Sequence, residues 1–157
     1  MISNAKYIIT VITSFILISC GTAERGIHTS ASSDGSKIVS QLNSAHYEWQ
    51  GIPYVLGGAG MSGVDCSAFI QIIFDNYFGV ELPRHTRDQL SAGSSVRRNF
   101  IRPGDLIFFR TGRGVLHVGI AMNDGDFLHA SVSQGVTISN IRENYWASRY
   151  LGTRRVL

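Results

Sequence analysis

One cysteine stands where its thiol could act as a nucleophile. Cys66 begins a strongly apolar helical segment and directly follows Gly63-Val64-Asp65. Exposed backbone N–H groups at a helix N-terminus favour a negative charge, so a thiolate there is stabilised and its pKa can fall below the ordinary value. We therefore predict a reactive thiolate at Cys66. The N–H groups that follow it are candidate oxyanion-hole donors.

Two histidines could supply the base that such a thiol needs. His117 begins one predicted strand and His129 lies in the next, with an Asn-Asp-Gly turn at 123–125 between them. In a hairpin these two positions should lie roughly opposite each other, and cross-strand neighbours have Cβ atoms about 4.5–5.5 Å apart. One imidazole could then serve as the base while the other orients it.

The residues around His117 also suggest which face of the strand meets the cysteine helix. Positions 117, 119 and 121 are His, Gly and Ala, so this face is nearly bare. We expect the helix that begins at Cys66 to pack on this bare face. Val118, Ile120 and Met122 should then point into apolar packing on the other side.

Spacing alone leaves two alternatives open. Cys66, His117 and His129 could be three ligands of a zinc ion with an open fourth position, although no further ligand spacing supports this. Alternatively, the histidines are satisfied core residues of a non-catalytic domain.

The N-terminus has the pattern of an export signal. Lys6 precedes an apolar run over 7–17, which is too short to span a bilayer, and small residues and Cys20 follow. Leu17-Ile18-Ser19-Cys20 resembles the lipobox of bacterial lipoproteins, in which the cysteine is acylated. We predict a signal peptide at 1–19 and a membrane anchor at Cys20. A disulfide between Cys20 and Cys66, or an inert Cys20, are the alternatives.

The rest of the chain reads as a tether followed by one α+β domain. Residues 20–36 include a segment rich in Gly, Ser and Thr that predicts a flexible tether, and the domain is expected over 37–157. Helical spacing predicts helices at 37–50 and 65–78, separated by a glycine-rich loop at 53–63. A short helix should follow Leu82-Pro83-Arg84-His85. Predicted strands are 106–109, 117–122, 126–130, 135–139 and 149–156.

The composition indicates one globular domain and does not indicate a nucleic-acid partner. The 157 residues include 44% hydrophobic and 16% charged residues, enough apolar material for one independent core. The net charge of +3 comes without a dense Lys/Arg stripe, so the sequence does not indicate a nucleic-acid binder. We expect a monomer that needs no cofactor.

Several motifs together resemble one family. Pro53-Tyr54-Val55-Leu56-Gly57-Gly58, the segment around Cys66, Leu82–Gln89, Arg102–Phe109, Leu116–Ile120 and Phe127–Ser131 are similar, in order and spacing, to the NlpC-type peptidoglycan cysteine peptidases. This resemblance implies a papain-like α+β fold, in which an antiparallel sheet packs against a buried helix that carries the nucleophilic cysteine at its N-terminus. It also implies that Cys66 attacks a peptide carbonyl, that His117 is the base and that His129 holds the His117 ring.

The same resemblance suggests residues that contact the substrate or the oxyanion. Tyr54 is similar to a tyrosine beside the nucleophile, and Asp65, Ser67 and Arg84 are similar to positions near the stem-peptide site. Local roles are the alternatives: a helix N-cap for Asp65, a small first-turn residue for Ser67, and helix initiation and packing around Arg84.

Together these patterns predict a lipid-anchored cell-wall endopeptidase that hydrolyses peptide bonds of peptidoglycan stem peptides or cross-links through a thioacyl intermediate. Gly21 after the cysteine suggests the outer membrane, facing the periplasm. The alternative is a catalytically silent wall-binding lipoprotein scaffold.

Overall fold

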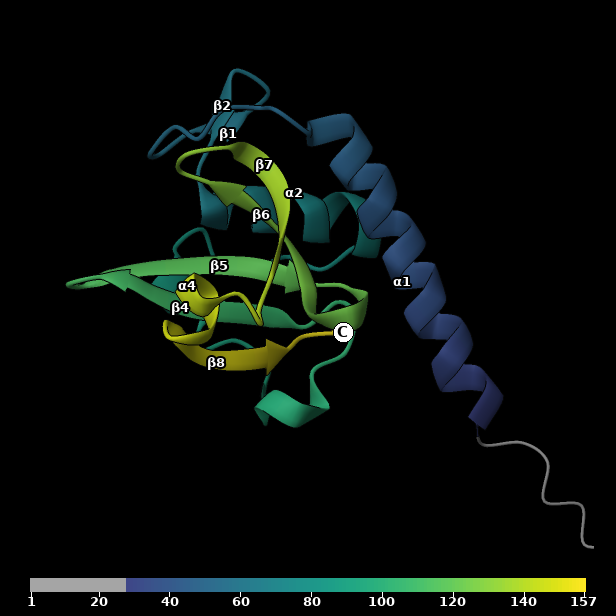
Figure 1. Ribbon diagram of the computed structural model, residues 1–157. Helices are drawn as coiled ribbons and strands as arrows, with labels where there is room; N and C mark the ends of the chain where they lie inside the picture. Colours follow the sequence, from purple (N-terminus) through teal and green to yellow (C-terminus); the bar gives the residue numbers. More distant parts are fainter. Residues whose placement is uncertain (1–27) are drawn as a thin grey trace, which may run out of the picture.

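The computed structural model describes residues 28–157, with side chains from residue 33 onward (Figure 1). The predicted signal peptide and the anchor at Cys20 lie outside the described residues. Helix α1 (His28–Trp49) begins earlier than the predicted 37–50, so residues 28–36 are helical and the tether prediction is wrong for them. Part of α1 is buried against the core, so the costly helix nucleus already exists there. Extending the helix toward its N-terminus then gains one hydrogen bond for each further residue that is ordered.

Helix α2 (Cys66–Phe78) confirms the prediction of a buried helix with the cysteine at its tip. The Asp65 carboxylate accepts a hydrogen bond from the Ala68 N–H at 2.8 Å and so caps the N-terminus. Gly79 ends the helix in the left-handed conformation, with φ of 65°. In Figure 1, α2 lies above β5 and behind β6 and β7, and its C-terminal end lies beside α1.

The strands form a six-stranded antiparallel sheet in the order β3-β8-β4-β5-β6-β7. All five predicted strands are present, and the edge strand β3 was not predicted because it has only three residues. The strands are β3 (Ser94–Val96), β4 (Leu106–Gly112), β5 (Val115–Ala121), β6 (Asp126–Ser131), β7 (Gly135–Asn140) and β8 (Tyr150–Arg155). The mixed architecture agrees with the predicted α+β class.

Short elements complete the fold, and two of them, β1 and α3, contact α2. Strands β1 and β2 pair as a small hairpin inside the glycine-rich loop. Their bounds and those of the remaining short elements are β1 (Ala59–Gly60), β2 (Gly63–Val64), α3 (Thr86–Gln89), η1 (Arg98–Phe100), η2 (Asn123–Gly125) and α4 (Asn144–Ala147). Within residues 28–157, none of the helices combines the length and the apolar character needed to cross a bilayer.

Helix α2 packs on the opposite face of β5 from the one that the sequence suggested. Val118, Ile120 and Met122 share one core cluster with the buried side chains of α2. Ala121, from the bare face, packs instead in a second, smaller cluster beneath Trp146. The branched and long side chains of β5 thus pack against the helix. Burying their apolar surface stabilises the fold more than packing the helix on the nearly bare face would.

Candidate active site

The Cys66 thiol lies at the tip of α2 and borders a cavity of about 390 Å³. Its sulfur is 3.7 Å from the Thr86 Oγ1, and the backbone N–H groups of Val118 and Ser67 also favour the thiolate. Cys66 is nevertheless only 4% exposed, and this burial raises the pKa of the thiol above its ordinary value. The prediction of a lowered pKa is therefore wrong for this structure, because loss of hydration outweighs the stabilising N–H groups.

His117 and His129 form a hydrogen-bonded pair. The His117 Nε2 lies 2.8 Å from the His129 Nδ1, and the His129 Nε2 lies 3.0 Å from the Ser139 Oγ. If His117 Nε2 and His129 Nε2 both carry hydrogens, each donates along this chain toward the serine oxygen. That arrangement leaves the His117 Nδ1 unprotonated and able to accept a proton.

The two imidazoles meet diagonally across the sheet. The register of β5 and β6 pairs Ile120 with Leu128, so its continuation places Gly119, rather than His117, opposite His129. The sequence predicted that the histidines lie roughly opposite each other, to within one residue, and the register differs from exact pairing by two residues. Gly119 makes the diagonal contact possible, since a Cβ there would lie 2.5 Å from the Phe127 Cδ2 and 3.2 Å from the His129 Cβ.

Aromatic side chains enclose both histidines. The Trp146 ring stacks on His117 with centroids 5.4 Å apart and meets His129 edge-on at 5.0 Å. Phe127 packs against His129 on another side. This burial lowers the pKa of His117 to about 4, and burial together with the neighbouring His117 lowers the pKa of His129 further. Both rings are therefore neutral at pH 7 in the resting protein.

The tip of α2 approaches β5 where that strand separates from β6. The ladder between these strands holds two pairs, Ile120–Leu128 and Ala121–Phe127, and stops before His117. The Val118 N–H interacts with the Cys66 sulfur at this point. The sulfur thus lies beside the peptide group that joins His117 to Val118.

An ion pair lies beneath the nucleophile. The Arg84 guanidinium donates to both carboxylate oxygens of Asp65, at 2.7 and 3.0 Å, and to the Ser67 Oγ at 3.1 Å. Burial alone would raise the pKa of Asp65, but hydrogen bonds from Arg84 and the Ala68 N–H, with the Arg84 charge, lower it. The hydrogen bonds to Asp65 raise the pKa of Arg84 in turn.

The glycine-rich loop closes over this ion pair. The Gly57 N–H donates to the Asp65 Oδ2 at 3.0 Å, and the Gly58 carbonyl accepts a hydrogen bond from the Asp65 N–H at 3.1 Å. A Cβ on Gly58 would lie 2.4 Å from the Gly63 oxygen, so only glycine permits this close approach. The Asp65 carboxylate is thus held in place by the hydrogen bonds that cap α2 and by its ion pair with Arg84.

Tyr54 borders the same cavity as Cys66. Burial, followed by the nearby Cys66 and Asp65, raises the pKa of Tyr54, so the phenol keeps its proton at neutral pH. Tyr54, Asp65, Ser67 and Arg84, the four residues predicted to contact the substrate or the oxyanion, all line the cavity. The structure therefore brings these four residues together with Cys66, whereas His117 borders a separate cavity, and the predicted lipidation site Cys20 lies outside the described residues.

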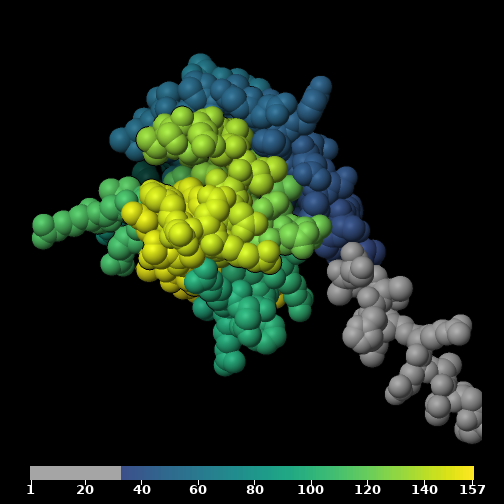
Figure 2. Space-filling model, viewed as in Figure 1, coloured from purple at the N-terminus to yellow at the C-terminus, as the bar shows by residue number. Residues whose placement is uncertain are grey.

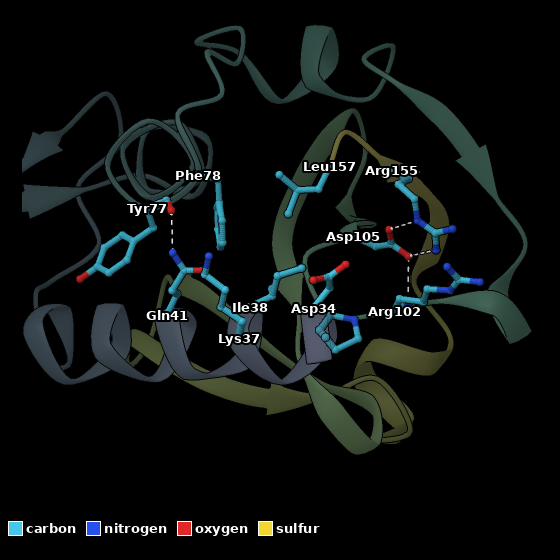
Figure 3. Close-up of a pocket in the computed structure, with 12 residues that line it drawn as sticks. Asp34, Lys37, Ile38, Gln41, Tyr77, Phe78, Arg102, Asp105, Arg155 and Leu157 are labelled. Atoms are coloured by element: carbon cyan, nitrogen blue, oxygen red, sulfur yellow. Dashed lines mark hydrogen bonds and ion pairs between the residues drawn. The ribbon is translucent and has the colours of Figure 1, made fainter. Parts of the chain in front are cut away.

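Another cavity, of about 610 Å³, contains none of the predicted site residues (Figure 3). It lies between α1, the end of α2 and the C-terminus. Its polar groups are largely paired: the Gln41 amide donates to the Tyr77 carbonyl at 2.8 Å, and Arg155 and Asp105 form an ion pair at 2.7 Å. No cysteine, serine or threonine is among the residues that line this cavity.

The zinc alternative gains no support from the geometry. It would need Cys66 and both histidines to point at one ion, whereas the His117 Nε2 and the His129 Nδ1 point at each other. Among residues 28–157, no group of three or more His, Cys, Asp or Glu side chains is placed to hold a metal.

Sequence reasoning missed the residues that hold the histidines and the thiol in place. Ser139 and Trp146 contact the imidazoles, and Thr86 lies beside the sulfur. Ser139 could have been found from the register of the last hairpin, because it lies two residues beyond the partner of His129 on the same face. Trp146 gave no such signal, because α4 is a single short turn outside the strand pattern.

The sequence is similar to those of known proteins. Residues 51–155 match the NlpC/P60 family. The chain is 46% identical over 120 residues to the murein DD-endopeptidase MepS/murein LD-carboxypeptidase of Escherichia coli K12, which covers 76% of this chain and 64% of that relative. It is 35% identical over 153 residues to the probable endopeptidase NlpC of the same organism, which covers 96% and 99%.

Solved structures show the same fold. An NlpC/P60 family protein of Bacillus cereus superposes with a TM-score of 0.68 at 29% identity, covering 78% of this chain and 40% of that one. The peptidoglycan hydrolase RipB of Mycobacterium tuberculosis superposes with a TM-score of 0.64 at 28% identity, covering 84% and 73%. The family match spans Cys66, both histidines and the whole six-stranded sheet. The chain belongs to the NlpC/P60 family.

Proposed function

We propose that this protein is a cysteine endopeptidase that hydrolyses peptide bonds in peptidoglycan stem peptides or cross-links. The observation that carries the proposal is the hydrogen-bonded chain from His117 through His129 to Ser139, together with a Cys66 sulfur that interacts with the Val118 N–H, in the peptide group directly after His117. Relatives named as murein endopeptidases and peptidoglycan hydrolases support the substrate class. Lipid anchoring through Cys20 at an outer membrane, facing the periplasm, completes the proposal, with a monomer as the acting form.

The first half of the reaction transfers the acyl group to the thiol. The Cys66 thiol gives its proton to the neutral His117 Nδ1 as the sulfur bonds to the peptide carbonyl carbon. The oxyanion that forms can accept hydrogen bonds from the backbone N–H at the helix tip and from the Tyr54 phenol. The carbon–nitrogen bond then breaks, and the leaving amine takes the proton from His117, which leaves a thioester.

The second half returns the enzyme to its starting state. A water molecule gives a proton to the His117 Nδ1 while its oxygen attacks the thioester carbonyl. The carbon–sulfur bond breaks, Cys66 recovers the proton, and a carboxylic acid is released. His129 and Ser139 keep the His117 ring oriented in both halves, and the His117–His129 hydrogen bond stabilises the imidazolium that forms between them.

Hydrolysis of purified peptidoglycan fragments tests the proposal. Wild-type protein should release new peptides, identified by mass spectrometry, whereas Cys66→Ala and Cys66→Ser should release none while keeping the circular dichroism spectrum of the wild type. Continued cleavage by Cys66→Ala would exclude the thiol mechanism.

A silent wild-type protein that still binds sacculi would indicate the scaffold alternative. Slow alkylation of Cys66 does not distinguish the two functions, because burial raises the pKa of this thiol in either case.

A further inference from the structure

A single side-chain hydroxyl lies within hydrogen-bond reach of the proposed nucleophile. The Thr86 Oγ1 is 3.7 Å from the Cys66 sulfur, and either group could be the donor. Both residues line the cavity of about 390 Å³, where Thr86 is half-buried. Among the side chains that the structure describes, the sulfur is the only hydrogen-bond partner of this hydroxyl, and the sulfur has no other side-chain partner.

The segment that carries Thr86 is fastened to the tip of α2. The side chain of Gln89, at the end of α3, is fully buried. Its amide donates to the Ser67 carbonyl at 3.0 Å and to the Pro83 carbonyl at 2.8 Å. One side chain thus joins the residues just before α3 to the first turn of α2, and this link holds the Thr86 hydroxyl beside the sulfur.

The cavity that Thr86 and Cys66 share lies between two segments of the chain. The glycine-rich loop contributes Leu56 to its lining, and β5 contributes Val115. In Figure 2 the tip of the β4–β5 hairpin projects at one edge of the molecule, below the blue residues that include the glycine-rich loop. Thr86 therefore borders the space in which a substrate would meet the sulfur.

The proposed reaction favours a hydrogen-bond donor at this position. At rest, a hydroxyl that donates to the sulfur leaves the thiol hydrogen free to reach the His117 Nδ1. Once that proton has moved, the thiolate can only accept hydrogen bonds, so only the donating orientation of the Thr86 hydroxyl stays favourable. Burial raises the pKa of the Cys66 thiol, and the hydrogen bond with Thr86 makes the largest opposing contribution.

We propose that Thr86 is a further catalytic residue, whose hydroxyl donates a hydrogen bond to the Cys66 sulfur and stabilises the negative charge that forms there when His117 takes the proton. This inference rests on the proposed hydrolase function for the reaction that uses the thiolate. Thr86 keeps its own proton throughout, so it neither relays the thiol proton nor bonds to the substrate.

Alkylation of Cys66 tests this role without any hydrolysis. The full-length wild type, Thr86→Val and Thr86→Ser react with iodoacetamide at several pH values, and peptide mass mapping separates modification of Cys66 from that of Cys20. Valine keeps the branched shape but removes the donor. Cys66 should then react about fivefold more slowly at pH 7, because the loss of thiolate outweighs the higher nucleophilicity of each thiolate. The difference should shrink as the pH rises, and Thr86→Ser should follow the wild type.

Thr153→Val is the matched control. It also removes a buried hydroxyl, one that lies 2.9 Å from the Tyr150 hydroxyl and lines neither the cavity of Cys66 nor that of His117. This variant should alkylate at the wild-type rate. Thr86→Ala removes the hydroxyl without adding a methyl group and replaces Thr86→Val if circular dichroism shows that the valine variant is unfolded.

Hydrolysis of peptidoglycan fragments supplies the second readout. Thr86→Val should lower kcat/KM by about tenfold, and Thr86→Ser should retain most of the activity. Equal alkylation of Thr86→Val and Thr153→Val at pH 7, or a slower reaction that Thr86→Ser shares, would overturn the role of the hydroxyl. A wild type that hydrolyses nothing, while its alkylation still depends on Thr86, would instead count against the hydrolase function alone.

Discussion

Acidification should destabilise this protein through the buried His117. The ring is 5% exposed, and burial lowers its pKa from 6.5 to about 4. Between these values the unfolded chain binds more protons than the folded one, so the free energy of unfolding falls as the pH falls. The difference, at about 1.4 kcal/mol per pH unit, amounts to about 3 kcal/mol. This contribution is complete above pH 6.5 and lost by about pH 4.

Chemical denaturation at several pH values measures this contribution. The wild type and His117→Gln are unfolded in urea at pH 7.5, 6, 5 and 4, because glutamine is neutral throughout. Between pH 7.5 and pH 4 the wild type should lose about 3 kcal/mol more than the variant. Ser139→Ala keeps both imidazoles and serves as the control, with the pH slope of the wild type.

In the proposed mechanism, the same neutral imidazole should determine how activity falls at acid pH. Because His117 must be unprotonated to accept the thiol proton, kcat/KM should stay nearly constant from pH 7 to about 5 and decline as the pH approaches 4. A midpoint near 6.5, or equal pH slopes for the wild type and His117→Gln, would show that the ring is hydrated in the free protein and would refute the reasoning.

Two further predictions concern packing and the ion pair. Gly119→Ala should cost about 1–3 kcal/mol of stability in thermal or urea unfolding and should slow hydrolysis, because the new methyl meets Phe127. Gly152→Ala is the matched control, since nothing lies within 4 Å of its added Cβ. Equal effects of the two substitutions would contradict the close contact at Gly119. Arg84→Met should cost about 2–3 kcal/mol at pH 7, since Asp65 stays buried without its partner. The carboxylate has a lowered pKa in the fold, so this cost should shrink as Asp65 becomes protonated below its ordinary pKa, and a cost independent of pH would argue against the ion pair.

The elements that position the site could be predicted because local signals specify them. Asp65 before an apolar run indicates a helix start, and Gly79 after it indicates a helix end, and both cap α2 as expected. The Asn-Asp-Gly turn at 123–125 correctly places His117 and His129 on neighbouring strands. Such signals act over a few residues, so they need no knowledge of the tertiary structure.

The arrangement of these elements could not be predicted in the same way. A period of two shows that β5 has two faces, but it does not tell which face a helix covers. The bare position at Gly119 is explained by the Phe127 and His129 side chains that cross it, and these come from a different strand. The pKa of Cys66 likewise depends on burial by distant segments, which a helix-tip argument leaves out.

The burial of Cys66 suggests a different reason for its place at the helix tip from the stable thiolate that the sequence predicted. A permanent thiolate at a site only 4% exposed would carry a large desolvation cost in the folded protein. A neutral thiol and a neutral imidazole avoid this cost. The raised pKa of Cys66 and the lowered pKa of His117 both favour these neutral forms at rest. In the proposed mechanism, negative charge develops on the sulfur only when its proton moves to His117 during attack. The N–H groups of Ser67 and Val118 favour that charge as it forms, so the helix tip stabilises the transition state more than the resting protein.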